Sequence, residues 1–549
     1  MSHVHEVVCA ETFLTDQFAQ PLPSAPTLTT TLLMTSLSVP PQLRPCLPGL
    51  SRHLRHWLAG IGMATTGLSW AQSATDSAAD PLVVAPAQIK VGIEKVKLPG
   101  DEKMGLVGTS YLIDVGRGLS VGPAVYGAIS GHRGGLFTVG AEVSYQRRIA
   151  GPFTVDAGFY AGGGGGGAAP VGGGLMLRPH VDLLWDFGPF LAGLSASQVR
   201  FANGDINSRQ VGLVWSAKTD FRYVPRDLIG QRSEISGRSG IGFDRVQAVF
   251  GAYSPRPSAK RNSGADYEGK IGFVGVRLER AVTDHLYWGI EAAGAASGGV
   301  AGYAEYLGTL GTETTVWPNK LTLGARMAVG MGGGGDVGVG GGLLLKGGVY
   351  GTVRLTRELG MSIEGGVTRA PQGSFKALHG AASLNWILDD PTDITAPLRN
   401  VRTEWVGGVE RYSALRRDGS TRVLQNDTLK ANRFVSPHFY LTGQAHSAYG
   451  GGAGGYTVGL FGAGVQSKIW GPVHAGAEML IGAAGGGGVS TEGGAIVQPN
   501  AYVGVDITRS LSVRVGAGQV KSLRQGGLNS KVLDVSVAFT FGAAGHGYR

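Results

Sequence analysis

The chain has 549 residues, of which 94 are glycine, and its formal net charge is +9. Glycine is more than twice as frequent as the usual value of about 7%, but it follows no Gly-X-Y period, which excludes a collagen-like triple helix. After residue 71 the sequence contains no run of about 18 apolar residues, which excludes membrane-spanning helices in that part.

Residues 1–71 predict an N-terminal extension that ends in a secretory signal peptide. Arg52 and Arg55 form a basic segment, residues 57–68 form a short apolar stretch, and small residues precede a cleavage point after Ala71. This stretch is too short to span a bilayer as a helix. The alternative is a disordered tail with an apolar run that arose by chance.

Both cysteines, Cys9 and Cys46, lie in this extension, so the exported part would hold no disulfide. The charges of the extension cancel (three arginines against three acidic residues, 3 − 3 = 0), which leaves the whole +9 to residues 72–549. A basic exported protein favours an anionic partner such as lipopolysaccharide, an acidic polymer or a small anion. Ordinary surface charge explains the same number.

A long internal repeat organises the rest of the sequence. Glycine tracts at 162–167, 332–335 and 485–488 each follow a proline and a β-patterned segment, and the prolines lie roughly 150–170 residues apart, much more than a solenoid period. The charged, proline-containing segments 224–245 and 389–402 separate the copies. We therefore expect repeat blocks at 72–223, 224–388 and 389–549.

The segments on both sides of each tract alternate between apolar and polar residues, which predicts strands with two different environments. After the first tract, Leu177, Val181 and Leu183 share one face. Arg178, His180 and Asp182 share the other face. The second and third copies repeat this pattern, with Lys346, Tyr350 and Arg354 or with Gln498 and Tyr502 on the polar face.

The predicted strands are about ten residues long, and many end in very short turns. In the first block they begin near Val91, Leu106, Leu119, Phe137, Phe153, Leu175, Phe190 and Gln210. With this alternation and strand length the chain resembles Gram-negative outer-membrane β-barrel proteins of the porin-like kind. The resemblance implies an all-β fold, a transmembrane antiparallel β-barrel of roughly 24 strands from three glycine-rich blocks of eight.

The even number of strands favours one closed barrel with both termini on the periplasmic side. The alternative is that each block closes as its own small barrel or sandwich. The resemblance also implies the cell outer membrane as location, with membrane lipids, lipopolysaccharide and the outer-membrane assembly machinery as partners. We expect no nucleic-acid partner.

Glycine inside strands costs stability and marks bends, bulges or close approaches of backbones. The three hairpins could kink inward and narrow the barrel mouth. They could instead present flat surfaces on which other segments pack closely, or they could be flexible outer loops.

The charged residues on the polar face are the candidate pore-lining residues, because rings of charge set ion preference. The positive candidates are Arg178, Arg326, Lys346, Arg354 and Arg514, and the negative ones are Asp156, Asp182, Glu478 and Asp506. Alternatively, these residues pair with one another and fill the interior. Arg200, Arg369 and Lys521 recur near the end of the seventh strand of each block, either as contacts to lipopolysaccharide phosphates or as an ordinary solvated rim.

No nucleophile, zinc or nucleotide-binding motif is present, so we expect no enzyme activity, no cofactor and no metal. His180 and Asp182 could form an acid–base pair, although a hydrogen-bond network is the more ordinary interpretation. The sequence thus predicts an outer-membrane channel or export pore for anionic solutes or polymers such as a polysaccharide. The alternative is a glycine-rich structural or adhesive cell-surface protein without transport activity.

Overall fold

The computed structural model describes residues 82–233, 243–388 and 398–546. The predicted signal peptide lies outside these residues. All three described segments belong to one compact unit, and within them no helix is long and apolar enough to cross a membrane.

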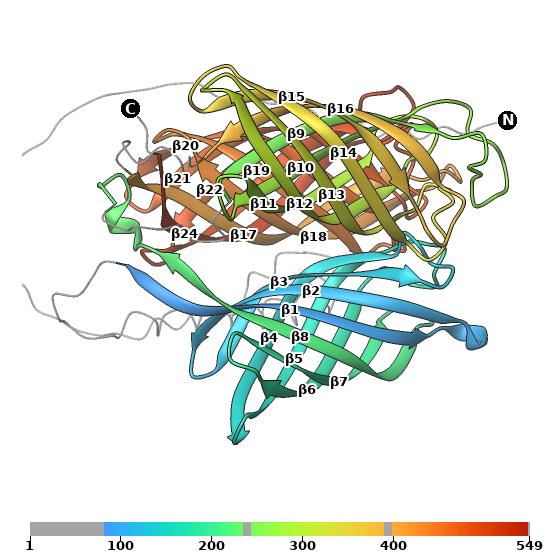
Figure 1. Cartoon of the computed structure of the whole chain (residues 1–549), viewed down its shortest axis with the longest axis horizontal. Coiled ribbons are helices and arrows are strands. Elements are labelled where there is room, and N and C mark those ends of the chain that lie inside the picture. The colour runs from blue at the N-terminus through green and yellow to red at the C-terminus, as the bar shows by residue number, and fades with distance from the viewer. Residues whose placement is uncertain (1–81, 234–242, 389–397, 547–549) are drawn as a thin grey trace, which may run out of the picture. The chain divides into compact units, whose positions relative to one another are not determined.

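The described residues form 24 strands in three sets of eight, and within each set consecutive strands pair in antiparallel fashion (Figure 1). The first eight, coloured from blue to green, are β1 (Val83–Lys97), β2 (Lys103–Gly116), β3 (Leu119–Ser130), β4 (Phe137–Ala150), β5 (Phe153–Gly165), β6 (Met176–Asp186), β7 (Phe190–Phe201) and β8 (Asn207–Tyr223). Two short 3₁₀ turns, η2 (Pro99–Asp101) and η3 (Arg226–Leu228), lie between β1 and β2 and after β8.

The second set comprises β9 (Arg245–Pro255), β10 (Ile271–Ala281), β11 (Leu286–Ala295), β12 (Ala304–Trp317), β13 (Leu321–Gly333), β14 (Leu343–Arg354), β15 (Leu359–Arg369) and β16 (Lys376–Ile387). The third comprises β17 (Leu398–Leu415), β18 (Thr421–Phe434), β19 (Phe439–Gly450), β20 (Thr457–Trp470), β21 (Val473–Gly485), β22 (Ala495–Asp506), β23 (Leu511–Ser522) and β24 (Asn529–His546). The all-β class and the total of 24 strands from three sets of eight are therefore confirmed.

Each set of eight strands closes on itself, so the expectation of one large barrel is wrong. β1 pairs with β8 from Val83↔Tyr223 onward, β9 pairs with β16, and β17 pairs with β24. We call these barrels 1, 2 and 3. A strand alternates between inward polar and outward apolar residues in a small barrel as it does in a large one. The alternation therefore predicts where the strands are but not which two strands pair to close the sheet.

The strands present their two faces as the alternation predicts. On β6 the apolar Val181 and Leu183 are 52% and 49% exposed, whereas Arg178 and Asp182 are 4% and 1% exposed. The polar face therefore points into each barrel and the apolar face points out, which is the inverse of a water-soluble barrel.

The glycine tracts lie where two barrels meet. Gly135 in the β3–β4 turn of barrel 1 lies against the backbone of Gly334 in barrel 2. A Cβ atom added to Gly302 in barrel 2 would lie 2.7 Å from the nitrogen of Gly486 in barrel 3, and one added to Gly455 would lie 2.7 Å from that of Gly166 in barrel 1.

The three junctions use equivalent positions of the repeat. Gly135, Gly302 and Gly455 each lie two residues before the first residue of the fourth strand that pairs with the fifth strand of the same barrel. All three have positive φ, from +91° to +96°, a conformation that side chains disfavour. Backbone hydrogen bonds cross two of the junctions, from Gly134 to Gly340 and from Gly455 to Gly164, each 3.0 Å long. The close packing of flat glycine surfaces is thus what the structure shows.

Separate closure predicts that one barrel folds alone. We expect residues 243–388, refolded in detergent, to show the heat-dependent gel mobility of a closed barrel, because both partners of β9, which are β10 and β16, lie within this segment. A segment that stays unfolded under conditions in which the full chain folds would contradict separate closure.

The glycine junctions predict that Gly302→Ala destabilises the protein more than Gly264→Ala does. Both residues have positive φ, +96° and +85°, so both substitutions cost about 1–2 kcal/mol of backbone strain. Only position 302 adds a clash across the junction, of about 1–3 kcal/mol, since Gly264 has no atom within 4 Å of the added Cβ. Guanidinium unfolding in micelles measures both, and equal losses would contradict a role for the junction.

Candidate functional site in the barrel interiors

The outer surface of each barrel is apolar at the middle of its strands. Met327, Val349 and Ile363 of barrel 2 are 64–75% exposed, and Val515 and Leu533 of barrel 3 are 58% and 62% exposed. Exposed aromatic residues gather at the short-turn end: Tyr145, Phe153, Trp185, Phe187 and Trp215 in barrel 1, Trp317 in barrel 2, and Phe439 and Trp470 in barrel 3. A closed antiparallel barrel with an apolar belt, an aromatic girdle and a polar interior has the architecture of outer-membrane β-barrel proteins.

The interior of barrel 1 holds a buried ammonium group among carboxylates. The Nζ atom of Lys90 on β1 lies 3.1 Å from Asp182, 3.3 Å from Asp156 and 3.4 Å from Glu142. In the same interior, Arg178 donates to both oxygens of Glu94, at 2.9 and 3.1 Å, and Ser197 donates to the same carboxylate. Four strands thus meet through charged side chains across the barrel axis.

Asp156, His180 and Asp182 are close enough to share a metal ion, since their ligand atoms lie within 4.8 Å of one another. The Nζ atom of Lys90 lies 3.2 Å from Nε2 of His180 and within 3.3 Å of both aspartates. The cation that these groups hold here is therefore the ammonium of Lys90. The predicted acid–base pair is part of this network, with 3.7 Å between His180 Nε2 and Asp182 Oδ2.

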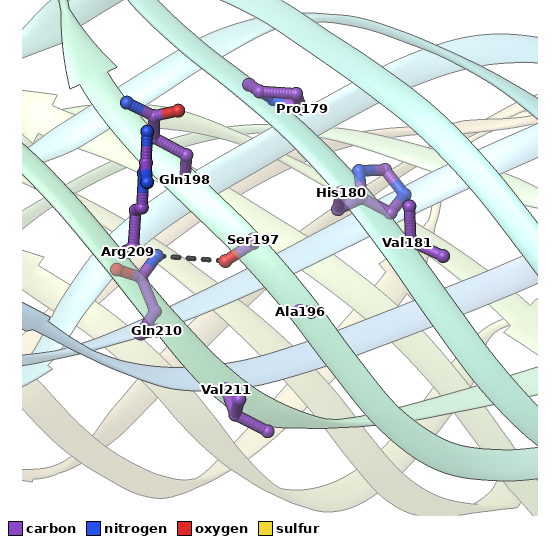
Figure 2. Close-up of a pocket in the computed structure, with 9 residues that line it drawn as sticks. All are labelled: Pro179, His180, Val181, Ala196, Ser197, Gln198, Arg209, Gln210 and Val211. Carbon is purple, nitrogen blue, oxygen red and sulfur yellow. Dashed lines mark hydrogen bonds between the residues drawn. The ribbon is translucent and has the colours of Figure 1, made fainter.

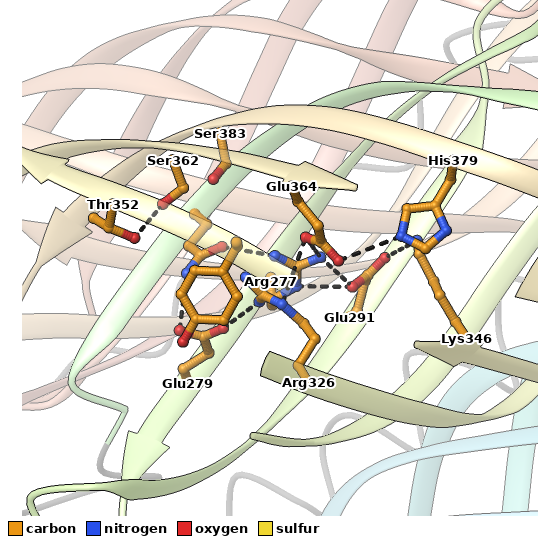
Figure 3. A network of polar contacts seen from close by, with 12 residues as sticks. Arg277, Glu279, Glu291, Arg326, Lys346, Thr352, Ser362, Glu364, His379 and Ser383 are labelled. Carbon is orange, nitrogen blue, oxygen red and sulfur yellow. Dashed lines mark hydrogen bonds and ion pairs between the residues drawn. The ribbon is translucent and has the colours of Figure 1, made fainter. Parts of the chain in front are cut away.

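Barrel 2 contains a larger network, shown in Figure 3. Arg277, which is 1% exposed, lies 2.7 Å from Glu291 and 3.1 Å from Glu364, and it donates to Gln247 at 2.8 Å. Lys346 lies 2.6 Å from Glu291 and 3.2 Å from Glu305.

Two further arginines, Arg326 and Arg245, extend this network toward the short-turn end of barrel 2. Arg326 lies 2.7 Å from Glu279, and Arg245 bridges Glu279 and Glu313 at 2.5 and 2.9 Å. At the other side, His379 lies 3.5 Å from Glu364 (Figure 3). The charged chain therefore runs through barrel 2 along its axis.

Barrel 3 uses more amides and tyrosines. Arg514 lies 2.8 Å from Glu404, and His446 lies 2.9 Å from Glu410. Glu478 accepts hydrogen bonds from Tyr440 at 2.8 Å and from Gln444 at 3.0 Å.

The structure places every candidate pore-lining residue on an inward face, and most of them are buried in ion pairs or hydrogen bonds. Arg178, Lys346, Arg326, Arg514, Asp156, Asp182 and Glu478 are 0–6% exposed. Arg354 is half-buried at the turn end of barrel 2. Asp506 lies at the same end of barrel 3, 2.9 Å from Arg226.

Sequence reasoning missed about half of the charged network in barrel 1 and most of it in barrel 2, because the candidates came mainly from the strands beside the glycine tracts. Glu94, Glu142 and Lys90 in barrel 1, and Arg277, Glu279, Glu291, Glu305 and Glu364 in barrel 2, lie on other strands. The same alternation carries them, and reading it in all eight strands of a block would have revealed them.

Buried carboxylates outnumber buried cations in each interior. Barrel 1 has Glu94, Glu142, Asp156 and Asp182 against Lys90 and Arg178 (4 against 2). Barrel 2 has Glu279, Glu291, Glu305 and Glu364 against Arg277, Arg326 and Lys346 (4 against 3). Barrel 3 has Glu404, Glu410, Glu478 and Asp534 against Arg514 and Lys430 (4 against 2). Each described interior also contains a histidine within 4 Å of a carboxylate.

A groove of about 660 Å³ lies on the wall of barrel 1 formed by β6, β7 and β8 (Figure 2). Pro179, Val181, Ala196, Gln198, Arg209 and Val211 line its outer part. The ladder between β6 and β7 is interrupted beside Pro179, because proline has no N–H group to donate. His180, Ser197 and Gln210 reach the groove from the inward face, where Gln210 donates to Ser197 at 2.9 Å.

No protein-family model matches the chain, and no curated protein matches it. Similar solved structures include the outer membrane protein OpdK from Pseudomonas aeruginosa, with 10% identity, 83% of this chain and 98% of that chain covered, and a TM-score of 0.21. The siderophore receptor PirA from Acinetobacter baumannii has 10% identity, coverages of 85% and 81%, and a TM-score of 0.26. OccK2 (OpdF) from Pseudomonas aeruginosa in complex with glucuronate has 9% identity, coverages of 84% and 98%, and a TM-score of 0.21. At these TM-scores most Cα positions do not superpose, and the likeness carries no conclusion on this chain.

The network in barrel 2 predicts a large loss of stability for Arg277→Met. The substitution leaves Glu291 and Glu364 buried with fewer positive partners, which costs about 3–5 kcal/mol. Lys260→Met is the matched control, because it removes an exposed ion pair with Asp266 and should cost less than about 1 kcal/mol. Unfolding in micelles measures both, and similar losses would show that the buried network does not stabilise the barrel.

Proposed function

We propose that this protein is an outer-membrane channel that conducts small ions along the charged interiors of its barrels, with interior ion pairs acting as the gate. The observation that supports this proposal most directly is the continuous network of ion pairs in barrel 2, which joins charged residues on every strand from β9 to β15. A barrel of eight strands has an interior that side chains can fill, so a passing ion must break and replace these pairs.

The cost of the network supports a functional role for it. Apolar side chains of similar size often fill a buried site as stably as an ion pair does, or more stably. Ionisable residues at membrane depth commonly mark ion pathways for this reason. The four buried carboxylates of each barrel are therefore the expected contacts of a passing ion.

The balance of charge favours cations over the anions expected from the sequence. Among the buried side chains of the described residues, carboxylates exceed cationic groups by two in barrels 1 and 3 and by one in barrel 2, where Arg245, 16% exposed, lies beside Glu279 as a further cation. A surplus of negative charge attracts cations and repels anions. Export of a polymer is not part of this proposal, because a barrel of eight strands is too narrow for one.

A second candidate is a structural membrane protein without transport activity. The burial of Glu142, Glu305 and Glu404, each 0% exposed, favours it, because no water path reaches these groups in this conformation. The two functions differ in one observable, which is the passage of ions.

Single-channel recording in planar bilayers tests the proposal. We expect residues 72–549 to give small, cation-preferring steps, far below those of a wide pore, because the ion pairs obstruct each interior. Asp156→Asn with Asp182→Asn should weaken the cation preference by removing two of the four buried carboxylates of barrel 1.

Asp266→Asn is the matched control, because this exposed carboxylate lies in a loop and outside every interior. It should leave conductance and selectivity unchanged. Folded, inserted protein that gives no steps at any voltage would overturn the channel and leave the structural function.

A further inference from the structure

We propose that the outer walls of barrels 1 and 3 bind a lipid whose headgroup carries phosphate, with the phosphate on a pair of basic residues and an acyl chain against the apolar wall beside them. In barrel 1 the pair is Arg200 and Arg209. In barrel 3 it is Lys521 and Lys531. This inference rests on the placement of the barrels in an outer membrane and does not depend on conduction.

The basic residues occupy equivalent places in the two walls. Arg209 on β8 pairs with Gln198 on β7, and Lys531 on β24 pairs with Gln519 on β23. In the same walls, Arg200 and Lys521 face Asn207 and Asn529. A Gln–Asn hydrogen bond recurs between these strands, Gln198 to Asn207 at 2.7 Å and Gln519 to Asn529 at 2.6 Å.

The apolar part of the wall recurs as well. Pro179 in barrel 1 pairs with Phe159 on β5, and Pro499 in barrel 3 pairs with Met479 on β21. Phe159 and Met479 are each the seventh residue of their strand, so the two prolines occupy equivalent positions. The strand ladder is interrupted at both prolines. Small residues flank the interruption on the next strand, Ala196 in barrel 1 and Ala517 in barrel 3.

These basic residues have no acidic partner within the described chain. All four are exposed, and none forms an ion pair with a described carboxylate. Each lies on the outward face, next to exposed apolar residues such as Val211, at 66%, and Leu533, at 62%. A cationic group that borders a hydrocarbon-facing surface fits the anionic headgroup of a lipid whose tail covers that surface.

The position along the barrel agrees with this occupant. The pairs lie at the end opposite the chain termini and the aromatic girdle, which is the outer side of a barrel whose termini are periplasmic. In barrel 1 the groove of about 660 Å³ continues from Arg209 and Gln198 to Val181 and Val211 (Figure 2). Barrel 2 has Gly347 in place of the proline and Val367 in place of the glutamine. It keeps Arg369 in the place of Arg200, but Leu378 stands in the place of Arg209, so the basic pair and the groove wall are both absent there.

Native mass spectrometry of the full chain in micelles tests the proposal, with lipid A carrying two phosphates as the probe. We expect two tightly bound lipids per chain. Arg200→Gln with Arg209→Gln should weaken one site by roughly tenfold, and Lys521→Gln with Lys531→Gln should weaken the other.

Arg147→Gln is the matched control, because Arg147 is an exposed, outward-facing base at the turn end of barrel 1. It should leave both sites intact, and inorganic phosphate at millimolar concentration should not displace the lipid. Equal binding of dephosphorylated lipid A would overturn the proposal in favour of a purely apolar groove. Displacement by inorganic phosphate, or equal loss in the Arg147 variant, would overturn it in favour of a free-anion site or unspecific charge.

Discussion

The closure of eight strands into one barrel is the constraint on which the rest of this structure depends. It sets an interior only wide enough for side chains, and it does so three times. Whatever faces inward must therefore pack against the opposite wall. Lys90 on β1 reaches Asp156 on β5 and Asp182 on β6 for this reason, and Arg277 on β10 reaches Glu364 on β15. In a wide pore these inward-facing charged residues would remain in contact with water. In a narrow barrel of eight strands the same residues pack against one another and form the core.

A core of ion pairs has a consequence for motion that an apolar core does not have. An ion pair can exchange partners, because a second partner of the same charge lies nearby: Lys346 is within 3.2 Å of both Glu291 and Glu305, and Arg326 lies near both Glu279 and Glu364. Partner exchange changes which groups obstruct the axis while the backbone ladder stays intact. A closed network with alternative partners can therefore gate a path without any movement of the strands, which a packed apolar core cannot do.

Of the eight strand starts expected in the first block, Leu119, Phe137, Phe153 and Phe190 are the observed ones, whereas β1 begins at Val83, eight residues before the expected Val91. The sequence also predicted the inward faces, because alternation depends only on the environment of each side chain. The number of barrels could not be predicted, since the choice of β8 as the partner of β1 rests on a pairing between strands more than one hundred residues apart. The pairing of Arg178 with Glu94 depends on that same closure, so the filled interior was out of reach for the same reason.

The glycine tracts explain why three barrels remain in one unit. Each barrel offers the turn before its fourth strand to the fifth-strand hairpin of another: barrel 1 to barrel 2, barrel 2 to barrel 3, and barrel 3 to barrel 1. These contacts form a closed cycle. With three barrels every turn and every glycine hairpin of this kind already has a partner, so a fourth barrel would find none to bind. Contacts between backbones demand glycine at both partners, as at Gly302 and Gly485, because a Cβ atom on either residue would clash with the backbone of the other barrel. The same demand recurs at every junction, and this accounts for tracts that recur with the period of the barrels.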